Sequence, residues 1–257
     1  MKILVIGFGE AGKPLFEIAR GVYQQVDSLD IEQKGLMFND PDVMHICYPE
    51  HDVHDFIDTS VKYIERFSPR LVLIESTVSP GVTLAVYKRL DRKPLMCHSP
   101  VRGNIAEGMK KGLLMYTKYI GPIDEESALE ARKYYESIGI HTFVCHSPIE
   151  TELAKLFETT YRGLMFAWFQ EIHRICKASG AKFSEVCDFI GSTEKEGKQP
   201  RPLFHPGVIG GHCILPNAQK LYQLYASKFV EALLESNKRR LVEIAEEQSR
   251  PVSDAQN

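Results

Sequence analysis

The sequence predicts an α/β protein, with a Rossmann-like doubly wound parallel sheet followed by an all-helical domain of long helices. Three observations lead to this fold class. Short apolar runs alternate with helical patterns over the first 147 residues, as in a parallel sheet. A glycine-rich turn separates the first run from the first helix. Beyond residue 147 the strand-like runs stop and helical periodicity takes over.

The expected strands of the first domain are short and apolar, which is typical of strands buried on both faces. They lie at residues 2–7, 25–31, 42–49, 70–76, 93–100, 116–122 and 141–147. Helical patterns separate most of them, and the clearest of these end at about Arg20 or occupy residues 52–66, 80–90 and 124–138. We therefore expect a Rossmann domain over residues 1–147.

A strong helix start marks the second domain. Ser147 is the expected N-cap, Pro148 suits the first helical position, and Glu150 completes a capping box. The helical pattern continues to about Ala178, where Gly180 is the expected stop. A helix of this length is expected to form the spine of a separate domain.

The rest of the second domain is expected to be helical around one irregular stretch. A shorter helix is expected at about 182–191, an irregular stretch at 192–215 and a last long helix at about 217–247. The end of the sequence, from about residue 249, is expected to be disordered. Residues 148–257 are predicted to form a helical dimerisation and substrate domain, and its two long apolar helices favour a homodimer.

Composition excludes several classes of function. The chain has 257 residues, 44% of them hydrophobic, and a formal net charge of -3 without blocks of like charge. Nucleic acid and membrane surfaces are therefore not expected partners. The first apolar run is too short for a signal peptide. Six scattered cysteines form no CxxC pair, so we expect a cytoplasmic protein with reduced thiols and no metal site.

The motif "GFGEAG" predicts a dinucleotide site. Gly7 allows the tight turn, Gly9 allows close approach of a pyrophosphate, and Gly12 allows the helix to pack on the strand. The helix N-terminus after the turn favours the negative charge of a phosphate. Asp30, at the end of the second strand, is placed to bind the adenosine ribose and to repel a 2′-phosphate, which favours NAD over NADP. The contact residues expected from the motif also include Phe8, Glu10 and Ala11.

A second glycine-rich stretch, "HPGVIGGHCILP" at residues 205–216, contains a candidate nucleophile. Its glycines allow the backbone to approach a ligand closely. Cys213 is either a nucleophile held on this loop or an ordinary buried thiol in a turn. The expected substrate-binding residues of this stretch are Gly207, Gly210, Gly211 and His212.

Several segments together resemble one family. They are "IGFGEAG", "IESTVSPGVT", "SPVRG", "ELAKLFETTYRGLMFAWFQEI" and "GVIGGHCILPN", and they cover about residues 1–245. In this order they resemble the nucleotide-sugar 6-dehydrogenases, the UDP-glucose and GDP-mannose dehydrogenase family. The resemblance implies two NAD-dependent oxidations of a sugar alcohol to a carboxylate. It also implies a truncated form, because the family's C-terminal UDP- or GDP-binding domain has no counterpart.

The resemblance assigns roles to matched residues. Cys213 matches the cysteine that captures the aldehyde, Lys155 matches the lysine that stabilises an oxyanion, and Thr77 matches a threonine near the reacting centre. Thr159 and Asn217 occupy two further catalytic positions. We expect Arg102 and Lys155 to contact substrate. Further cofactor contacts are expected from Tyr48, Pro49, Ser76 and Thr77.

The chain also departs from the family pattern. Val101 and Ile105 stand where the family has glutamates, Thr159 where it has an asparagine, and Asn217 where it has an aspartate. The water that cleaves a thioester is left without an evident general base. Candidate substitutes are His98, His212 and Glu107, although both histidines are read first as satisfied polar residues in loops.

Three functions are compatible with these residues. The first is an NAD-dependent oxidoreductase acting on a CH–OH group of a small alcohol or sugar-derived substrate, with Cys213 as nucleophile. The second is a single-step alcohol dehydrogenase or carbonyl reductase of the β-hydroxyacid dehydrogenase type, with Lys155 as acid and base. The third is a non-catalytic NAD-binding regulatory protein. In all three, Lys155 and Thr159 share a polar stripe with Glu152 and Arg162, which could equally be a solvated helix face.

Overall fold

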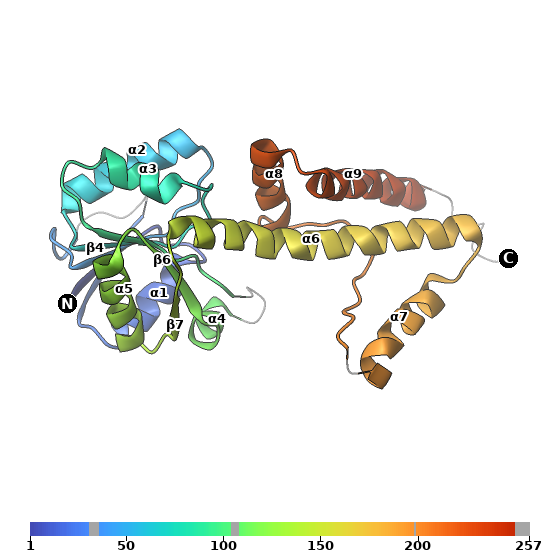
Figure 1. The fold of residues 1–257 in the computed structure, drawn as a ribbon, viewed down its shortest axis with the longest axis horizontal. Helices are drawn as coiled ribbons and strands as arrows, with labels where there is room; N and C mark the ends of the chain where they lie inside the picture. Colours follow the sequence, from blue (N-terminus) through green and yellow to red (C-terminus); the bar gives the residue numbers. More distant parts are fainter. Residues whose placement is uncertain (31–35, 104–107, 198, 250–257) are drawn as a thin grey trace. The chain divides into compact units, whose positions relative to one another are not determined.

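The structure is a computed structural model that describes residues 1–30, 36–103, 108–197 and 199–249 (Figure 1). The chain divides into two compact units, Met1–Lys155 and Leu156–Asn257, each with hydrophobic clusters of its own. The tail expected to be disordered lies, from residue 250 onwards, outside the described residues. None of the described helices is both long enough and apolar enough to span a membrane.

The first unit is built around one sheet. Within the described residues its seven strands have the order β2-β1-β3-β4-β5-β6-β7, and β1 to β5 are mutually parallel. The doubly wound sheet is therefore confirmed. Each strand is shorter than the apolar run that predicted it, because the ends of the runs form the loops at the sheet edges. The strands are β1 (Lys2–Ile6), β2 (Gln25–Leu29), β3 (Val43–Ile46), β4 (Leu71–Ile74), β5 (Leu95–His98), β6 (Lys118–Pro122) and β7 (Thr142–Val144).

One edge of the sheet differs from the expected all-parallel arrangement. Strand β6 pairs antiparallel with β5, with Cys97 opposite Pro122 and His98 opposite Gly121, and β7 then pairs parallel with β6. Between β5 and β6 the chain forms a short helix, α4 (Met109–Met115), that the sequence pattern did not predict. The return of the chain through α4 reverses the strand direction, and strand direction leaves no mark in an apolar run.

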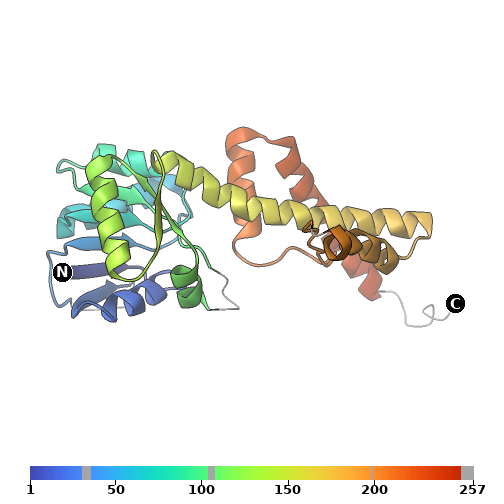
Figure 2. The ribbon, with the colours of Figure 1, turned by 60° about the horizontal axis from the view of Figure 1, so that its bottom comes forward.

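Helices cover both faces of the sheet (Figure 1). On one face lie α2 (Val53–Phe67) and α3 (Val82–Arg89), and on the other lie α1 (Gly12–Arg20), α4 and α5 (Glu125–Ser137). The turned view shows α5 across the front of the strands (Figure 2). Asp52 caps α2 by accepting hydrogen bonds from His54 N and Asp55 N, and Asp124 caps α5 at Ser127 N.

A buried charged network lies inside the first unit. Burial alone would raise the pKa of Glu75, but Lys118 and His45 lower it to about 2. One Glu75 oxygen accepts from the Tyr135 hydroxyl at 2.6 Å and lies 2.8 Å from His45 Nδ1, while Lys118 Nζ donates to the other oxygen. The second ring nitrogen of His45 lies 2.7 Å from the Tyr134 hydroxyl. The network joins β3, β4, β6 and α5 directly beneath the loop that leaves β4.

The second unit is helical throughout its regular structure, as predicted. The long helix α6 (Pro148–Ser179) begins with the expected capping box: Ser147 N donates to the Glu150 carboxylate at 2.8 Å. Gly180 follows it with a φ of 74°. Helix α7 (Phe183–Gly197) is longer than predicted. Gly163 lets α6 approach its neighbours, because a Cβ there would lie 2.6 Å from Ile214 Cγ2.

The predicted last helix is in fact two helices. Helix α8 (Ile214–Tyr225) ends at Ala226, whose φ of 47° is left-handed, and α9 (Lys228–Ser249) follows. No glycine or proline marks this break, so the prediction of one continuous helix was wrong. A left-handed alanine costs about 1–2 kcal/mol. The turn brings Leu221 of α8 and Leu233 of α9 into one buried cluster, which offsets that cost.

Candidate functional site

The glycine turn has the geometry that a dinucleotide site requires. Gly7 has a φ of 89°, and a Cβ there would lie 2.8 Å from Tyr48 N. A Cβ on Gly12 would lie 1.8 Å from Gly7 O, so the start of α1 packs directly on the turn. A Cβ on Gly9, in contrast, would have no heavy atom within 4 Å. Gly7 and Gly12 are therefore needed by the fold, while Gly9 leaves open space for a ligand.

The turn lies at the topological switch point of the sheet. The chain moves from β1 to β2 on one side and then to β3 on the other, so the loops after β1 and β3 diverge at the carboxyl edge. Gly7 and Tyr48 are side by side here. One Asp30 carboxylate oxygen accepts from Phe8 N at 2.9 Å, which fixes the acid beside the turn. The open space, the helix N-terminus and this acid fit a dinucleotide.

The other residues predicted for cofactor binding share this edge. Ser76 Oγ donates to Tyr48 O at 2.6 Å, which joins the loops after β3 and β4. The Tyr48 hydroxyl is hydrogen-bonded to Ser60 Oγ, and burial raises the pKa of the phenol. Thr77 is partly buried. Pro49 and Glu10 are exposed, whereas Ala11 is partly buried.

Two buried glutamates that were not predicted as site residues hold the loop after β4. Glu50 accepts from Ser79 N at 2.6 Å and from Ser79 Oγ at 2.7 Å. Glu152 accepts from Gly81 N at 2.6 Å and from Thr83 N at 2.9 Å. The Glu152 side chain is fully buried. The interpretation of the polar stripe on this helix as a solvated face was therefore wrong for Glu152. Lys155, on the same helix, is partly buried, and Arg162 is exposed.

In the second unit, Cys213 lies at the start of α8. All six cysteines fall in the described part of the chain, and Cys213 alone among them is exposed. Gly211 supplies a φ of 81° just before it, and Gly210 and His212 are also exposed. Nothing lies within 4 Å of a Cβ built on either glycine, so both leave room for a ligand. The thiol thus stands on an open glycine loop at a helix N-terminus.

Side chains of α6 and α9 hold the loop before Cys213. Gln170 Nε2 donates to Gly207 O at 2.7 Å, Ile209 N donates to Asn237 Oδ1 at 2.7 Å, and Arg240 Nε donates to Pro206 O at 2.6 Å. Gln170, Asn237 and Arg240 are all buried. Gln170 and Asn237 are uncharged polar residues on helices that were expected to pack, which is the sequence signal that could have found them, whereas Arg240 also pairs with Glu243.

Two of the altered family positions contact each other within the second unit. Asn217 Nδ2 donates to Thr159 Oγ1 at 3.0 Å, and Asn217 N donates to Cys213 O at 3.2 Å. Asn217 is buried and Thr159 is partly buried. Thr159 lies one helical turn beyond Lys155, and Asn217 lies one turn beyond Cys213. The hydrogen bond therefore joins two neutral side chains, each one turn away from a predicted catalytic residue.

The candidate substitute bases differ in their surroundings. Ile105 and Glu107 lie outside the described residues. Val101 is buried in the core cluster of the first unit. His98 is a fully buried strand residue and not a loop residue as predicted, because β5 extends through it. Its Nε2–H donates to Ser76 O at 3.0 Å, and its Nδ1 lies 2.7 Å from Thr151 Oγ1.

Arg102, the predicted substrate contact of the first unit, lies near two aromatic rings. Its guanidinium carbon is 5.4 Å from the centroid of Tyr116 and 5.5 Å from that of Tyr119. Such cation–π contacts hold the side chain in place while leaving guanidinium hydrogens available. The arginine is partly exposed.

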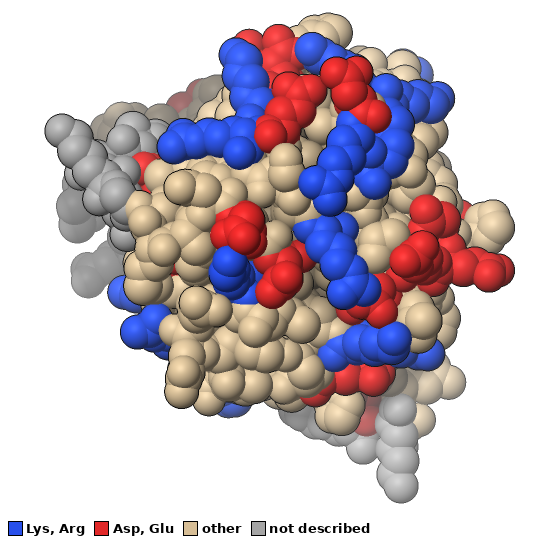
Figure 3. All heavy atoms as spheres, turned by 90° about the vertical axis from the view of Figure 1, so that its left-hand side faces the viewer, with Lys and Arg blue, Asp and Glu red and all other residues tan. Residues whose placement is uncertain are grey.

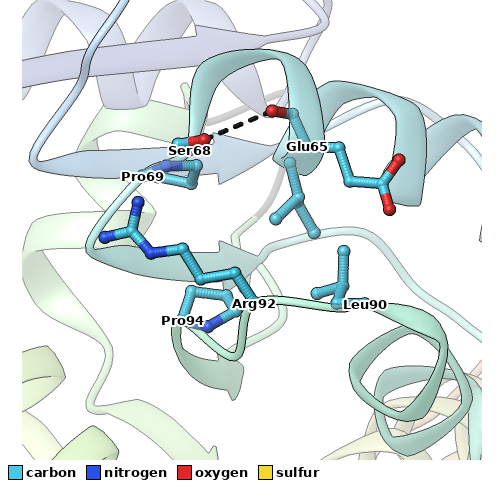
Figure 4. A pocket seen from close by; sticks show the side chains of 7 residues that line it. Glu65, Ser68, Pro69, Leu90, Arg92 and Pro94 are labelled. Carbon is cyan, nitrogen blue, oxygen red and sulfur yellow. Dashed lines mark hydrogen bonds between the residues drawn. The ribbon is translucent and has the colours of Figure 1, made fainter.

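Other hollows are poorer candidates for the site. The pocket in Figure 4 is lined by Ser68, Pro69, Leu90, Arg92 and Pro94, which precede β4 and β5, at the edge opposite the glycine turn. Ligands of such sheets bind at the carboxyl edge. A hollow on α6 and α9 contains Arg174 and Arg240, which are paired with Glu243. On the face in Figure 3, basic and acidic side chains are intermixed.

A Rossmann sheet with this glycine turn, followed by a long helix and a helical unit, is typical of the class of dinucleotide-binding proteins. Residues 149–239 match the model of the UDP-glucose/GDP-mannose dehydrogenase family, central domain. The UDP-N-acetyl-D-mannosamine dehydrogenase of Methanocaldococcus jannaschii is 30% identical over 228 residues, which are 83% of this chain and 51% of that protein. The chain belongs to the UDP-glucose/GDP-mannose dehydrogenase family. Members of the family use NAD, and membership supports NAD as the cofactor here.

Solved structures share the fold. The structure of UDP-D-ManNAc dehydrogenase from Pyrococcus horikoshii has a TM-score of 0.79 at 21% identity, covering 96% of this chain and 70% of that one. The 3-hydroxyisobutyrate dehydrogenase of Mycobacterium tuberculosis has a TM-score of 0.68 at 16% identity, covering 95% and 94%. Among the curated relatives, the match covers 51% of the Methanocaldococcus jannaschii protein and 36% of the UDP-N-acetyl-D-mannosamine dehydrogenase of Methanococcus vannielii, so the chain spans about half the length of the first and less of the second.

The buried state of His98 predicts a pH dependence of stability. Burial lowers the pKa of His98 to about 4, from 6.5 for an ordinary histidine. As the pH falls below 6.5, the unfolded chain protonates at this histidine before the folded chain does, and the free energy of unfolding decreases. The total loss is about 3 kcal/mol and is complete once the pH has fallen through 4. In His98→Gln, whose amide can keep both bonds, the free energy of unfolding should fall less steeply between pH 6.5 and 4. Urea denaturation across this range measures it.

His141→Gln is the matched control, because His141 is exposed. Its stability profile should follow that of the unaltered chain. Equal slopes for His98→Gln and the unaltered chain would contradict the assignment of a buried neutral ring.

Proposed function

We propose that the protein is an NAD-dependent oxidoreductase that oxidises a CH–OH group of a sugar-derived alcohol. The glycine turn supports the cofactor half most directly, because Gly9 is open where a pyrophosphate would approach and Asp30 is fixed beside it. Bound NAD supplies the hydride acceptor. Family membership supports a sugar-derived substrate, since the matched relatives are named as dehydrogenases of UDP-sugars.

The proposed catalytic residues are Lys155, Thr77 and Cys213. The Lys155 ammonium stabilises negative charge on the substrate oxygen, and Thr77 contacts the reacting centre. Cys213 supplies a thiol on an exposed loop at a helix N-terminus, where developing negative charge is favoured. Arg102 and the backbone of the glycine loop around Gly210 bind the rest of the substrate.

In the full reaction, the alcohol first loses a hydride and a proton to give an aldehyde. The Cys213 sulfur then adds to the aldehyde carbon, and a second hydride transfer from the thiohemiacetal gives a thioester. Water cleaves the thioester to a carboxylate and restores the thiol. This hydrolysis step has the least support in the present residues. A neutral Thr159–Asn217 pair stands where the family pattern has an asparagine and an aspartate.

A one-step reaction is the second candidate function. The neutral Thr159–Asn217 pair favours it, since a single oxidation needs an acid and base such as Lys155 but no hydrolytic base. Its product would be an aldehyde or ketone, with one hydride transferred per substrate.

A second copy of the chain is the proposed partner. Helix α6 exposes a stripe of apolar side chains, with Tyr161 63%, Trp168 55% and Ile175 55% exposed. They recur at intervals of seven residues, the spacing of a helix seam that packs against another helix. Burial of such a stripe in a homodimer removes it from water.

Substitutions at Gly9 and Gly12 are expected to affect different properties, namely NAD affinity and stability. Gly9→Ala should weaken NAD binding by about tenfold or more, because the new methyl group occupies the pyrophosphate space. Its free energy of unfolding should stay within about 1 kcal/mol. Gly12→Ala should instead destabilise the fold by at least about 2 kcal/mol through the clash with Gly7 O. Calorimetric titration and urea denaturation measure the two effects, and unaltered NAD affinity in Gly9→Ala would sink the proposed site.

The role of Cys213 is tested by product yield. With UDP-N-acetyl-D-mannosamine and UDP-glucose as probes, the covalent reaction yields two NADH per substrate and an acid. Cys213→Ala should then lose the second oxidation, because no thiohemiacetal can form. Cys187→Ala is the control. One NADH per substrate in both the unaltered protein and Cys213→Ala would support the one-step reaction. NAD binding by the unaltered protein without any turnover would support a regulatory role.

The homodimer is tested by mass. Light scattering should give twice the chain mass for the unaltered protein and the single chain mass for Trp168→Glu, because a buried unpaired carboxylate opposes association. Lys182→Glu changes an exposed side chain outside the stripe and should remain dimeric. A monomeric unaltered protein would contradict the proposed partner.

A further inference from the structure

Two adjacent residues of α6 hold both ends of the loop that carries Thr77. Thr151 Oγ1 lies 2.7 Å from His98 Nδ1, and the opposite nitrogen of that ring donates to Ser76 O, next to Thr77. Glu152 accepts from the amides of Gly81 and Thr83 at the far end of the loop. Both α6 side chains are at most 1% exposed, and both belong to the first unit.

The carboxylate of Glu152 substitutes for a missing local cap. Helix α3 begins after Gly81, which has no side chain to cap it, and its first turn contains no acidic residue. Glu152 supplies the cap from 71 residues further along the chain. Burial raises the pKa of Glu152, and the hydrogen bonds from Gly81 and Thr83 oppose this rise by stabilising the charged carboxylate.

A fixed start of α6 also fixes Lys155. Gly121 of β6 packs against this start, since a Cβ there would lie 2.4 Å from Thr151 Oγ1 and 2.6 Å from Ser147 O. Lys155 follows Glu152 by three residues, so the two side chains project from neighbouring points of one helix. The same pair of residues therefore connects the Thr77 loop to the turn of α6 that bears the lysine.

We propose that Thr151 and Glu152 form a two-point clamp that positions Thr77 and Lys155 relative to each other. Neither clamp residue needs to touch substrate, because each acts by fixing backbone that bears a catalytic group. The inference rests on the proposed roles of Thr77 and Lys155. A shift of a reacting group by about 1 Å can cost about a hundredfold in rate.

A double-mutant cycle tests the clamp. Glu152→Gln preserves shape but lacks one acceptor, so kcat for NADH formation should fall about 10- to 100-fold while NAD affinity is unchanged. If Glu152 acts through Lys155, the same change should cause little further loss in a Lys155→Ala background. Glu158→Gln removes an exposed charge from the same helix and should leave kcat unaltered. Additive losses in the cycle, or normal kcat in Glu152→Gln, would overturn the clamp.

A second readout requires no turnover. The rate at which trace acetic anhydride acetylates Lys155 should change by about twofold or more in Glu152→Gln and not in Glu158→Gln, because the lysine environment shifts. An unchanged rate overturns the clamp. If Glu152→Gln does not fold, Thr151→Ala removes the other contact and should alter the same rate. A normal kcat in Lys155→Ala, or no turnover by the unaltered protein, instead rejects the proposed function. In that case the acetylation rate of Lys155 in Glu152→Gln still tests the clamp.

Discussion

Three buried carboxylates fix the segment from the end of β4 to the start of α3, and the rest of the carboxyl edge depends on them. Glu75 anchors the beginning of the segment through Lys118, His45 and Tyr135. Glu50 and Glu152 hold its second half through backbone amides. Removing carboxylates from water is costly unless cations or amides replace the lost hydration. The segment is consequently anchored by buried hydrogen bonds on both sides of Thr77.

Local signals predicted much of this edge correctly. The spacing of Gly7, Gly9 and Gly12 indicated a turn whose geometry the structure confirms, and the capping box at Ser147 marked the true start of α6. These features depend on residues within a few positions of one another, and their backbone requirements are specific. The fold class followed from the same signals together with the alternation of apolar runs.

Long-range features were not predictable in the same way. The antiparallel β6 and the left-handed Ala226 leave no local pattern, because strand pairing and the shared α8–α9 core decide them. Glu152 looked like one end of a polar stripe, and only its contacts 71 residues away show it as a buried cap. The neutral pair of Thr159 and Asn217 was visible as two departures, but their hydrogen bond was not.

We propose that the carboxyl edge beside Gly9 binds NAD and that Asp30 selects NAD over NADP. Calorimetric titration of the purified chain with NAD and with NADP tests this most directly. Saturable NAD binding, with NADP at least about tenfold weaker, is the expected result, because the Asp30 carboxylate accepts the ribose hydroxyls and repels a 2′-phosphate. Equal or tighter binding of NADP, or no binding of NAD, would contradict it.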